Sequence, residues 1–277
     1  MGMHPHLRRV AAYHLGLTSA VGVRSRELAV YPTLALLAAE AAGDDPLPAL
    51  TLAAATEMAH GFWLLHEDAI DGNRIRGQRL AAWVAFGLRD AILTGQALSF
   101  LALEVLTADR NPWGTVAAER LNEALSELVR GKTHAIWLDA QADVNVEEYL
   151  TMVGHKAALF AYSTATGALM GHGQVATAET LGALGRQLGL IHQLVVELRA
   201  KAHPAREPGT PVGGRTAMAG ERLPVGWDWA RREIRQRLRA ALDALEGIDM
   251  PGRTRDELAS LTWHFAKGMN QFRDSNI

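Results

Sequence analysis

The sequence contains no cysteine, and aromatic residues make up only 6% of its 277 positions. Without cysteine, a disulfide framework, a thiolate metal site and a cysteine nucleophile are all excluded. A formal net charge of −2 argues against a general nucleic-acid binder, which needs an excess of basic residues. No signal-peptide core is visible at the N-terminus, and we expect no membrane span. These absences predict a cytoplasmic protein.

Alternating strand-like patterns are also missing, and apolar residues recur almost everywhere at helical spacing. One stretch, 203–226, differs because it holds four prolines and five glycines and shows no periodicity, so we predict a mobile loop there. The rest of the chain predicts an all-α fold in one domain, 1–277. The expected helices cover 32–42, 49–71, 88–106, 116–141, 146–169, 177–200, 227–245 and 255–272.

Acidic residues gather at the end of the second of these helices. Glu67, Asp68 and Asp71 stand three and four residues apart, which places them on one helix face. Each close pair of like charges repels by up to roughly 4 kcal/mol at an effective dielectric near 20. Such oxygen clusters commonly hold a divalent cation, and Arg74 and Arg76 just beyond add anion-binding charge. The pattern predicts a Mg²⁺–diphosphate site, and a solvated acidic helix end is the alternative.

Four segments in order resemble the trans-isoprenyl diphosphate synthases, the polyprenyl synthetase branch of the class I terpenoid synthases. Residues 32–41 are similar to the helix after that family's GKxxRP segment, and His66-Glu67-Asp68-Ala69-Ile70-Asp71 resembles its HDDxxD motif. Residues 148–160 resemble its YxxMIxxKTxxLF segment, and residues 185–194 resemble the run before its second aspartate-rich motif. The resemblance implies a bundle of ten or more helices around a deep central cavity, an allylic prenyl diphosphate substrate, Mg²⁺ and a homodimer.

The sequence departs from the family at the second aspartate-rich motif. That motif falls on residues 196–200, where Glu197 is the one remaining carboxylate, so the metal site opposite Glu67 is weakened. The family's Gly-Asp is Gly95-Gln96 here, and its Gly-Gln-x-x-Asp is Gly131-Lys132-Thr133-His134-Ala135. The resemblance therefore implies a cavity that has lost acids and gained the cation of Lys132.

A second departure concerns the homoallylic partner of chain elongation, isopentenyl diphosphate. The lysine and arginine of the GKxxRP segment align with Leu28 and Tyr31, and the second arginine after the first motif aligns with Gly77. These residues do not hold a doubly charged headgroup, although Arg24 or Arg26 could substitute through a shifted alignment. We therefore do not expect ordinary elongation.

The resemblance assigns roles residue by residue. The predicted metal ligands are Glu67, Asp68, Asp71 and Glu197, and the predicted diphosphate and substrate contacts are Arg74, Arg76, Lys156 and Gln193. Lys132 and Lys156 are expected to stabilise the leaving group, and His192 is a candidate base or a structural histidine satisfied by a backbone partner. Phe62 and Trp63, just before the first motif, either cap the cavity or are simply core.

Two hypotheses of different kinds follow. The first is a terpene synthase that ionises a short allylic diphosphate and lets the cation cyclise or be quenched. The substrate would have about ten to twenty carbons if Trp63 and Phe62 shorten the cavity. Transfer of the cation to an acceptor other than isopentenyl diphosphate is a variant of this hypothesis. The second is a catalytically inactive subunit that binds an active prenyl synthase and alters its product. Chain elongation as a prenyltransferase is the third and weakest reading. In the first reading Arg206 and Arg215, in the predicted loop, could reach the diphosphate when the loop closes, and a disordered connector is the alternative for this segment.

Overall fold

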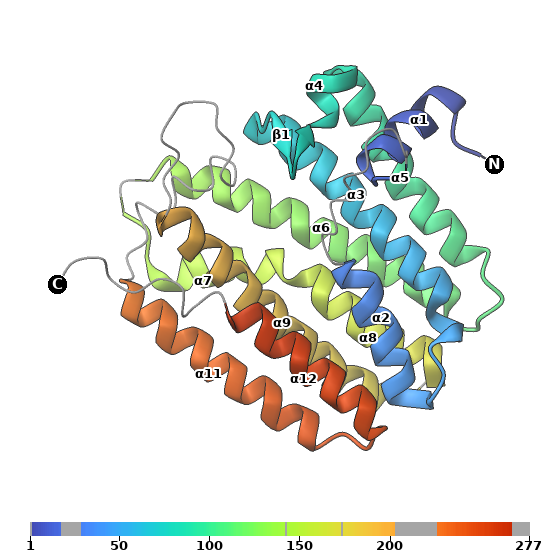
Figure 1. Ribbon diagram of the computed structural model, residues 1–277, viewed down its shortest axis with the longest axis vertical. Coiled ribbons are helices and arrows are strands. Elements are labelled where there is room, and N and C mark those ends of the chain that lie inside the picture. Colours follow the sequence, from blue (N-terminus) through green and yellow to red (C-terminus); the bar gives the residue numbers. More distant parts are fainter. Residues whose placement is uncertain (1, 18–28, 142, 173, 203–225, 268–277) are drawn as a thin grey trace.

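The chain folds almost entirely into helices. The computed structural model describes residues 2–17, 29–141, 143–172, 174–202 and 226–267. These residues form eleven α-helices, one 3-10 turn and one two-stranded antiparallel hairpin, which confirms the all-α prediction (Figure 1). The elements are α1 (Pro5–His14), α2 (Val30–Gly43), η1 (Leu47–Ala49), α3 (Leu50–Asp71), β1 (Ile75–Arg76), β2 (Arg79–Leu80), α4 (Ala82–Phe86), α5 (Leu88–Thr107), α6 (Gly114–Asp139), α7 (Val146–Lys156), α8 (Ala158–His172), α9 (Val175–Ala202), α11 (Trp227–Glu246) and α12 (Gly252–Lys267).

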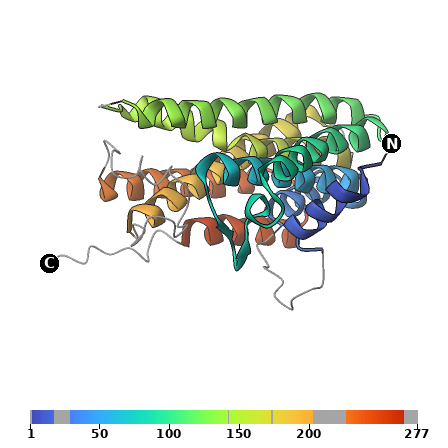
Figure 2. The ribbon, with the colours of Figure 1, turned by 90° about the horizontal axis from the view of Figure 1, so that it is seen from above.

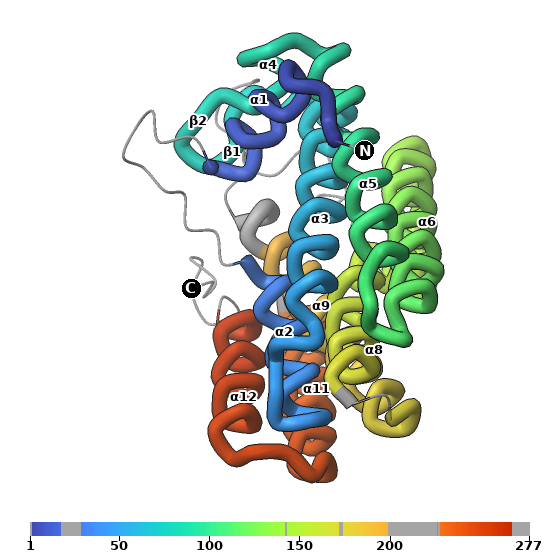
Figure 3. Tube along the Cα trace, turned by 90° about the vertical axis from the view of Figure 1, so that its right-hand side faces the viewer, coloured from blue at the N-terminus to red at the C-terminus, as the bar shows by residue number. Residues whose placement is uncertain are grey.

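The long helices are arranged in layers. Helices α5 and α6 lie along one side of the bundle and α11 and α12 along the other, as Figures 2 and 3 show. Between them, α8 packs against both α2 and α9, and α3 packs against α5. The short elements α1, α4 and the hairpin gather at the end of the bundle where α3 finishes (Figure 3). This end carries the acidic residues of α3.

Small residues decide how closely α2 and α8 approach. A Cβ atom built on Gly167 of α8 would lie 2.3 Å from the carbonyl oxygen of Ala35, and one on Gly171 would lie 2.6 Å from that of Ala39. No side chain fits in these spaces, so the backbones of the two helices touch. The contact places α2, with Tyr31 in its first turn, beside α8.

Most of the expected helices are confirmed to within a few residues, but the helix expected over 146–169 is two helices. Helix α7 ends at Lys156, and the N–H of Ala157 donates to the carbonyls of both Val153 and Gly154, which tightens the last turn. Lys156 therefore stands at a helix end instead of in a helix interior. Helices α1 and α4 and the hairpin were not predicted.

Some predictions fall outside the described residues. The loop expected over 203–226, with Arg206 and Arg215, lies outside them except for Gly226, and Arg24, Arg26 and Leu28 also lie outside. The single domain, 1–277, stays a prediction.

One helix of the described chain, Leu88–Thr107, is long and apolar enough to cross a membrane, with a mean hydropathy of 1.3 over its most apolar window. This α5 helix packs against α1, α3, α4 and α6, so it is part of the bundle. Only 39% of that window is buried, which leaves an apolar face of α5 uncovered.

Candidate functional site

The acidic residues of α3 are the starting point of the site. Helix α3 runs to Asp71 and ends at Gly72, whose φ of 71° gives the left-handed conformation common after a helix. As predicted, Glu67, Asp68 and Asp71 lie in the last two turns of this helix. Asp68 is 2% exposed, while Glu67 and Asp71 are partly buried. Carboxylates in such positions need partners.

Arg76 is the partner of Asp68. The hairpin turns the chain back so that the Arg76 Nε lies 2.6 Å from Asp68 Oδ2 and its Nη2 lies 2.6 Å from Oδ1. This two-pronged arrangement is the strongest that arginine makes with a carboxylate. The same Nη2 is 3.7 Å from Glu67 Oε2, and Asn73 Nδ2 donates to Asp68 Oδ1 at 3.3 Å. Arg76 thus ties two of the three acids.

Lys132 is the partner of Asp71. Its ammonium, on α6, donates to Asp71 Oδ1 at 2.5 Å and to Oδ2 at 2.6 Å. The two side chains are 6% and 7% exposed, so the pair is shielded from water. The predicted gain of a cation in the site is therefore seen as a direct bond to the first motif.

Lys156 of α7 and Glu197 of α9 form a third ion pair. The Lys156 Nζ, at the end of α7, lies 3.6 Å from Glu197 Oε1 on α9, and both side chains are buried. The hydroxyl of Tyr149, two turns before Lys156 on α7, is buried and has no hydrogen-bond partner in the described part of the chain. Burial, assisted by Glu197, raises the pKa of Tyr149 well above its ordinary value.

Glu67 interacts electrostatically both with the residues around the end of α3 and with the Lys156–Glu197 pair. Burial raises the pKa of Glu67, an effect that Lys132, Lys156 and Arg76 oppose and Asp71 reinforces. Burial likewise raises the pKa of Glu197, opposed by Lys156 and reinforced by Asp139 and Glu67. The charge of Glu67 thus acts on Glu197, and all three cations act on Glu67. The three acids of α3 with Arg76, Lys132 of α6, Lys156 of α7 and Glu197 of α9 form one charged cluster.

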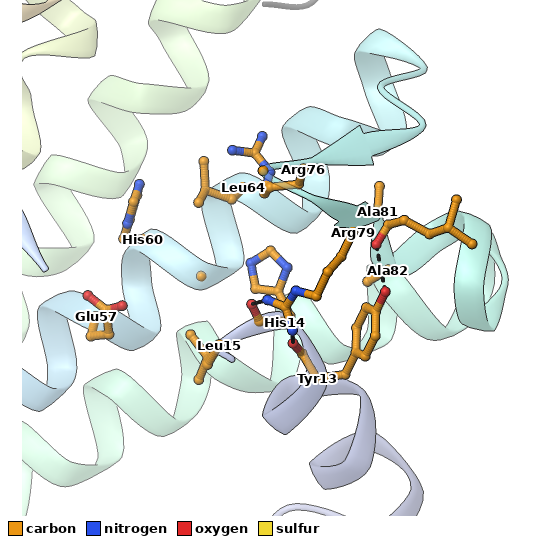
Figure 4. Close-up of a pocket in the computed structure, with 13 residues that line it drawn as sticks. Tyr13, His14, Leu15, Glu57, His60, Leu64, Arg76, Arg79, Ala81 and Ala82 are labelled. Carbon is orange, nitrogen blue, oxygen red and sulfur yellow. Dashed lines mark hydrogen bonds between the residues drawn. The ribbon is translucent and has the colours of Figure 1, made fainter. Parts of the chain in front are cut away.

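A small cavity adjoins this cluster on the side of α1. It has a volume of about 110 Å³ and lies between the end of α1, the middle of α3 and the hairpin (Figure 4). Arg79 points at the end of α1, where its Nη1 donates to the Tyr13 carbonyl at 2.8 Å and its Nη2 to the His14 carbonyl at 3.5 Å. Tyr13 in turn donates to the Leu80 carbonyl at 2.9 Å. The hairpin and α1 hold each other in place.

The two histidines that line this cavity are uncharged at neutral pH. Burial, assisted by Arg76, lowers the pKa of His14 to about 4 and that of His60 to about 3. The ring of His60 also meets Tyr31 edge to face at 4.7 Å, and Tyr31 meets Phe160 at 4.9 Å. Tyr31, which replaces a basic residue in the resemblance, therefore fills space beside His60.

The remaining predicted substrate residues lie in different places. Phe62 is buried and packs edge to face on His66 at 4.7 Å, while Trp63 is half-buried at the edge of the same core cluster. Phe62 also lines a groove of about 430 Å³ between α5 and α6. Arg74 is exposed, with its guanidinium 5.9 Å from the Trp83 ring centre, and is not part of the charged cluster.

His192 and Gln193 lie further along α9. The ring of His192 lies 5.5 Å from both Phe160 and Phe265, between α8 and α12, and Gln193 is half-buried. His192 thus sits among aromatic side chains, and its role as a base stays a prediction.

The predicted metal ligands do not form a metal group as they lie. In the ranges that the structure describes, no three His, Asp or Glu side chains are placed to hold one ion. Both oxygens of Asp68 accept from Arg76, and both of Asp71 accept from Lys132. The acids therefore do not fit a set of Mg²⁺ ions in this arrangement, and the assignment to Glu67, Asp68, Asp71 and Glu197 stays a prediction.

Sequence reasoning missed several residues of this region. His60 had the clearest signal, because it stands seven residues, or two turns, before Glu67 and therefore on the same face of that helix. Arg79 stood in the sequence as a third arginine after the acids, but nothing in its spacing linked it to Tyr13 and His14. Tyr149 carried no signal beyond its place in the family segment.

This all-α bundle, with an acidic helix end facing basic side chains, has the isoprenoid synthase fold. A crystal structure of a polyprenyl synthetase from Streptomyces coelicolor A3(2) superposes with a TM-score of 0.79 at 30% identity, covering 95% of this chain and 93% of that one. The polyprenyl synthetase family model matches residues 5–196, and the chain belongs to this family.

Two curated relatives come from Mycobacterium tuberculosis H37Rv. The (2E,6E)-farnesyl diphosphate synthase is 36% identical over 229 residues, and the geranylgeranyl diphosphate synthase is 35% identical over 228. The matches cover 81% and 80% of this chain but 64% and 65% of those relatives. The chain therefore spans less than two thirds of the curated relatives' length.

Proposed function

We propose that this protein binds one allylic prenyl diphosphate and converts it without chain elongation, as a terpene synthase on a prenyl synthetase scaffold. The membership in the polyprenyl synthetase family supports the substrate class. The relatives' names indicate short prenyl chains, which agrees with Phe62 and Trp63 standing before the first motif. A substrate of about ten to twenty carbons, limited by these two aromatics, is part of the proposal.

One observation carries the absence of elongation: the side of the site where the resemblance implies a second diphosphate is closed by the protein's own side chains. Tyr31 packs against His60, and Arg79 donates to the carbonyls that end α1. His14 and His60 are uncharged there, so they do not balance a second diphosphate. The cavity that is left, about 110 Å³, is smaller than the space that ligand sites usually offer, roughly 300–1,000 Å³.

Ionisation of the first diphosphate draws on the charged cluster. In this proposal Arg76, Lys132 and Lys156 stabilise the negative charge that develops on the leaving diphosphate, as fixed cations in a shielded site do. Exclusion of water by the surrounding helices keeps a carbocation from being quenched at once. Cyclisation and transfer to a non-isopentenyl acceptor both remain within the proposal.

Product analysis tests this function. The purified protein is incubated with geranyl, farnesyl or geranylgeranyl diphosphate, each with and without isopentenyl diphosphate and with and without Mg²⁺. A hydrocarbon or alcohol formed without isopentenyl diphosphate supports the proposal, and its carbon number gives the substrate. A longer diphosphate formed only with isopentenyl diphosphate contradicts it.

A second candidate is an inactive subunit that modulates a prenyl synthase, and the paired acids favour it. Asp68 and Asp71 are bound to Arg76 and Lys132 in a way that suits a structural core as well as a catalytic one. No turnover with any substrate, together with a stable complex with an active synthase, would establish this candidate.

The proposal includes a homodimer through the uncovered side of α5 and α6. Leu93 and Phe100 on α5 and Val129 and Ile136 on α6 are 56%, 62%, 51% and 53% exposed. Large apolar patches of this kind mark contact surfaces. Light scattering of the wild type and of Phe100→Asp tests this: the wild type should be a dimer and the variant a monomer. The cytoplasmic location stays a prediction.

A further inference from the structure

The charged cluster already contains the cations that a diphosphate needs. Among the described residues it comprises four carboxylates (Glu67, Asp68, Asp71 and Glu197) and three basic side chains (Arg76, Lys132 and Lys156). Its formal charge is therefore close to −1 before any ion binds.

A divalent ion at Asp71 would meet Lys132 directly. The ammonium holds both oxygens of Asp71 at 2.5 and 2.6 Å, so an ion bound to that carboxylate would lie within about 4 Å of it. At this distance the positive charges of the ion and of the ammonium repel each other, and the repulsion from a doubly charged ion is twice that from a singly charged one. The Asp71 carboxylate is thus poorly suited to a divalent ion while Lys132 is present.

The same arrangement suits an anion. An ammonium has three donors, and the recorded hydrogen bonds of Lys132 use two of them, both on Asp71. Facing it, Lys156 is 8% exposed and the Tyr149 hydroxyl is buried without a partner in the described ranges. A buried donor with no acceptor is costly unless something accepts from it. The residues around Glu67 thus offer charge and donors to a bound oxyanion.

The sequence of α9 also disfavours a divalent ion in this site. Val196 and Ala200 stand at the two other positions where the resemblance implies acids, so Glu197 is the one carboxylate of the motif. That carboxylate is paired with Lys156. A divalent ion shared between α3 and α9 would therefore find one carboxylate on the α9 side.

We propose that this cluster binds the diphosphate group directly through Arg76, Lys132 and Lys156, without a divalent cation. The inference rests on the proposed function only in taking a prenyl chain as part of the ligand. Binding of the diphosphate group can be tested independently, because inorganic pyrophosphate carries the same group. Lys132 acts as a built-in counter-ion, and Asp71 holds it in place.

Calorimetric binding tests the inference on the full chain. The probes are inorganic pyrophosphate and farnesyl thiolodiphosphate, which does not ionise readily, each in EDTA and in excess Mg²⁺. We expect dissociation constants in EDTA within about threefold of those in Mg²⁺. Lys132→Gln should weaken binding in EDTA by about tenfold or more, whereas Lys132→Arg should keep it.

Two further variants separate a binding role from a folding role. Asp71→Asn keeps the shape of the site and removes the competitor for Lys132, so metal-free binding should hold or tighten. Lys267→Gln, at an exposed position, is the charge-matched control and should bind like the wild type. Circular dichroism confirms that each variant is folded, and addition of Mg²⁺ to Lys132→Gln should restore binding, because Asp71 is then open to the ion.

The outcomes distinguish this inference from the proposed function. Binding of both probes only in Mg²⁺ would overturn the inference and leave the terpene synthase proposal standing. Binding in EDTA without turnover of any allylic diphosphate would support the inference and contradict the proposed function. Absence of binding in both conditions would overturn both.

Discussion

Replacement of Arg76 by methionine offers a sharp test of how the acidic motif is held. The substitution removes both 2.6 Å bonds to Asp68 and leaves that 2% exposed carboxylate with Asn73 at 3.3 Å as its recorded side-chain partner. Loss of one member of a buried ion pair typically costs about 3–5 kcal/mol, because the other charge stays buried without compensation. With an unfolding entropy of roughly 2.1 cal/mol/K per residue over 277 residues, this corresponds to a melting temperature about 5–9 °C lower.

The assay is urea unfolding and calorimetry of Arg76→Met beside a control from the same hairpin. Arg74→Met removes an exposed arginine whose recorded contact is with the Trp83 ring, and should change stability by less than about 1 kcal/mol. The double variant Asp68→Asn with Arg76→Met should recover part of the loss, since a neutral amide is cheaper to bury than a carboxylate. Equal losses in Arg76→Met and Arg74→Met would refute the account of Arg76 as the tie between the hairpin and α3.

Three further predictions concern packing, pH and chain length. Gly95→Ala would place a Cβ 2.6 Å from His66 Cδ2, so chemical denaturation should show a free energy of unfolding lower by about 1–3 kcal/mol. Gly154→Ala on α7, with nothing within 4 Å, should keep or raise this free energy. An unchanged stability of Gly95→Ala would show that the His66 ring is not fixed. Burial lowers the pKa of His60 from 6.5 to about 3, so below pH 6.5 the unfolded chain binds a proton that the folded chain does not. The free energy of unfolding should therefore fall as the pH falls from about 6.5 to 4. His60→Gln should flatten this dependence, whereas His264→Gln, at an exposed position, should leave it unchanged. Phe62→Ala removes a buried ring and should cost about 3–5 kcal/mol while shifting binding from farnesyl toward geranylgeranyl thiolodiphosphate, and an unchanged preference would assign Phe62 to the core alone.

The sequence was sufficient for features that depend on neighbours along the chain. The helical period predicted α3 and the common face of Glu67, Asp68 and Asp71, because both depend on spacing within one helix. The resemblance placed Lys132 and Lys156 near these acids. It did not show which acid each lysine would hold, since the Asp71–Lys132 pair joins residues 61 positions apart and depends on how α3 packs beside α6.

Features that depend on short or irregular segments could not be predicted from the sequence. Helix α1 has ten residues, too few for a long apolar pattern. Its start carries Pro5 at the first helical position, but its end is held by Arg79, which is distant in the sequence. The break after Lys156 was missed because residues on both sides favour helix. Both helices pack against α6 and α9, and α8 also packs against α2, a long-range contact that the sequence does not show. Tyr31 was read as the loss of a basic residue, while its packing on His60 came from the approach of α2 to α3.

The break after α7 also sets the local field at Lys156. The last carbonyl groups of a helix carry about half a negative elementary charge, and a cation in the final turn gains roughly 0.3–2 kcal/mol from them. Lys156 is the last residue of α7, so its ammonium is stabilised by the backbone as well as by Glu197. Lys132, seven residues before the end of α6, has no such support. The two lysines therefore differ in how firmly they depend on their acids: Glu197 can be exchanged at less cost than Asp71.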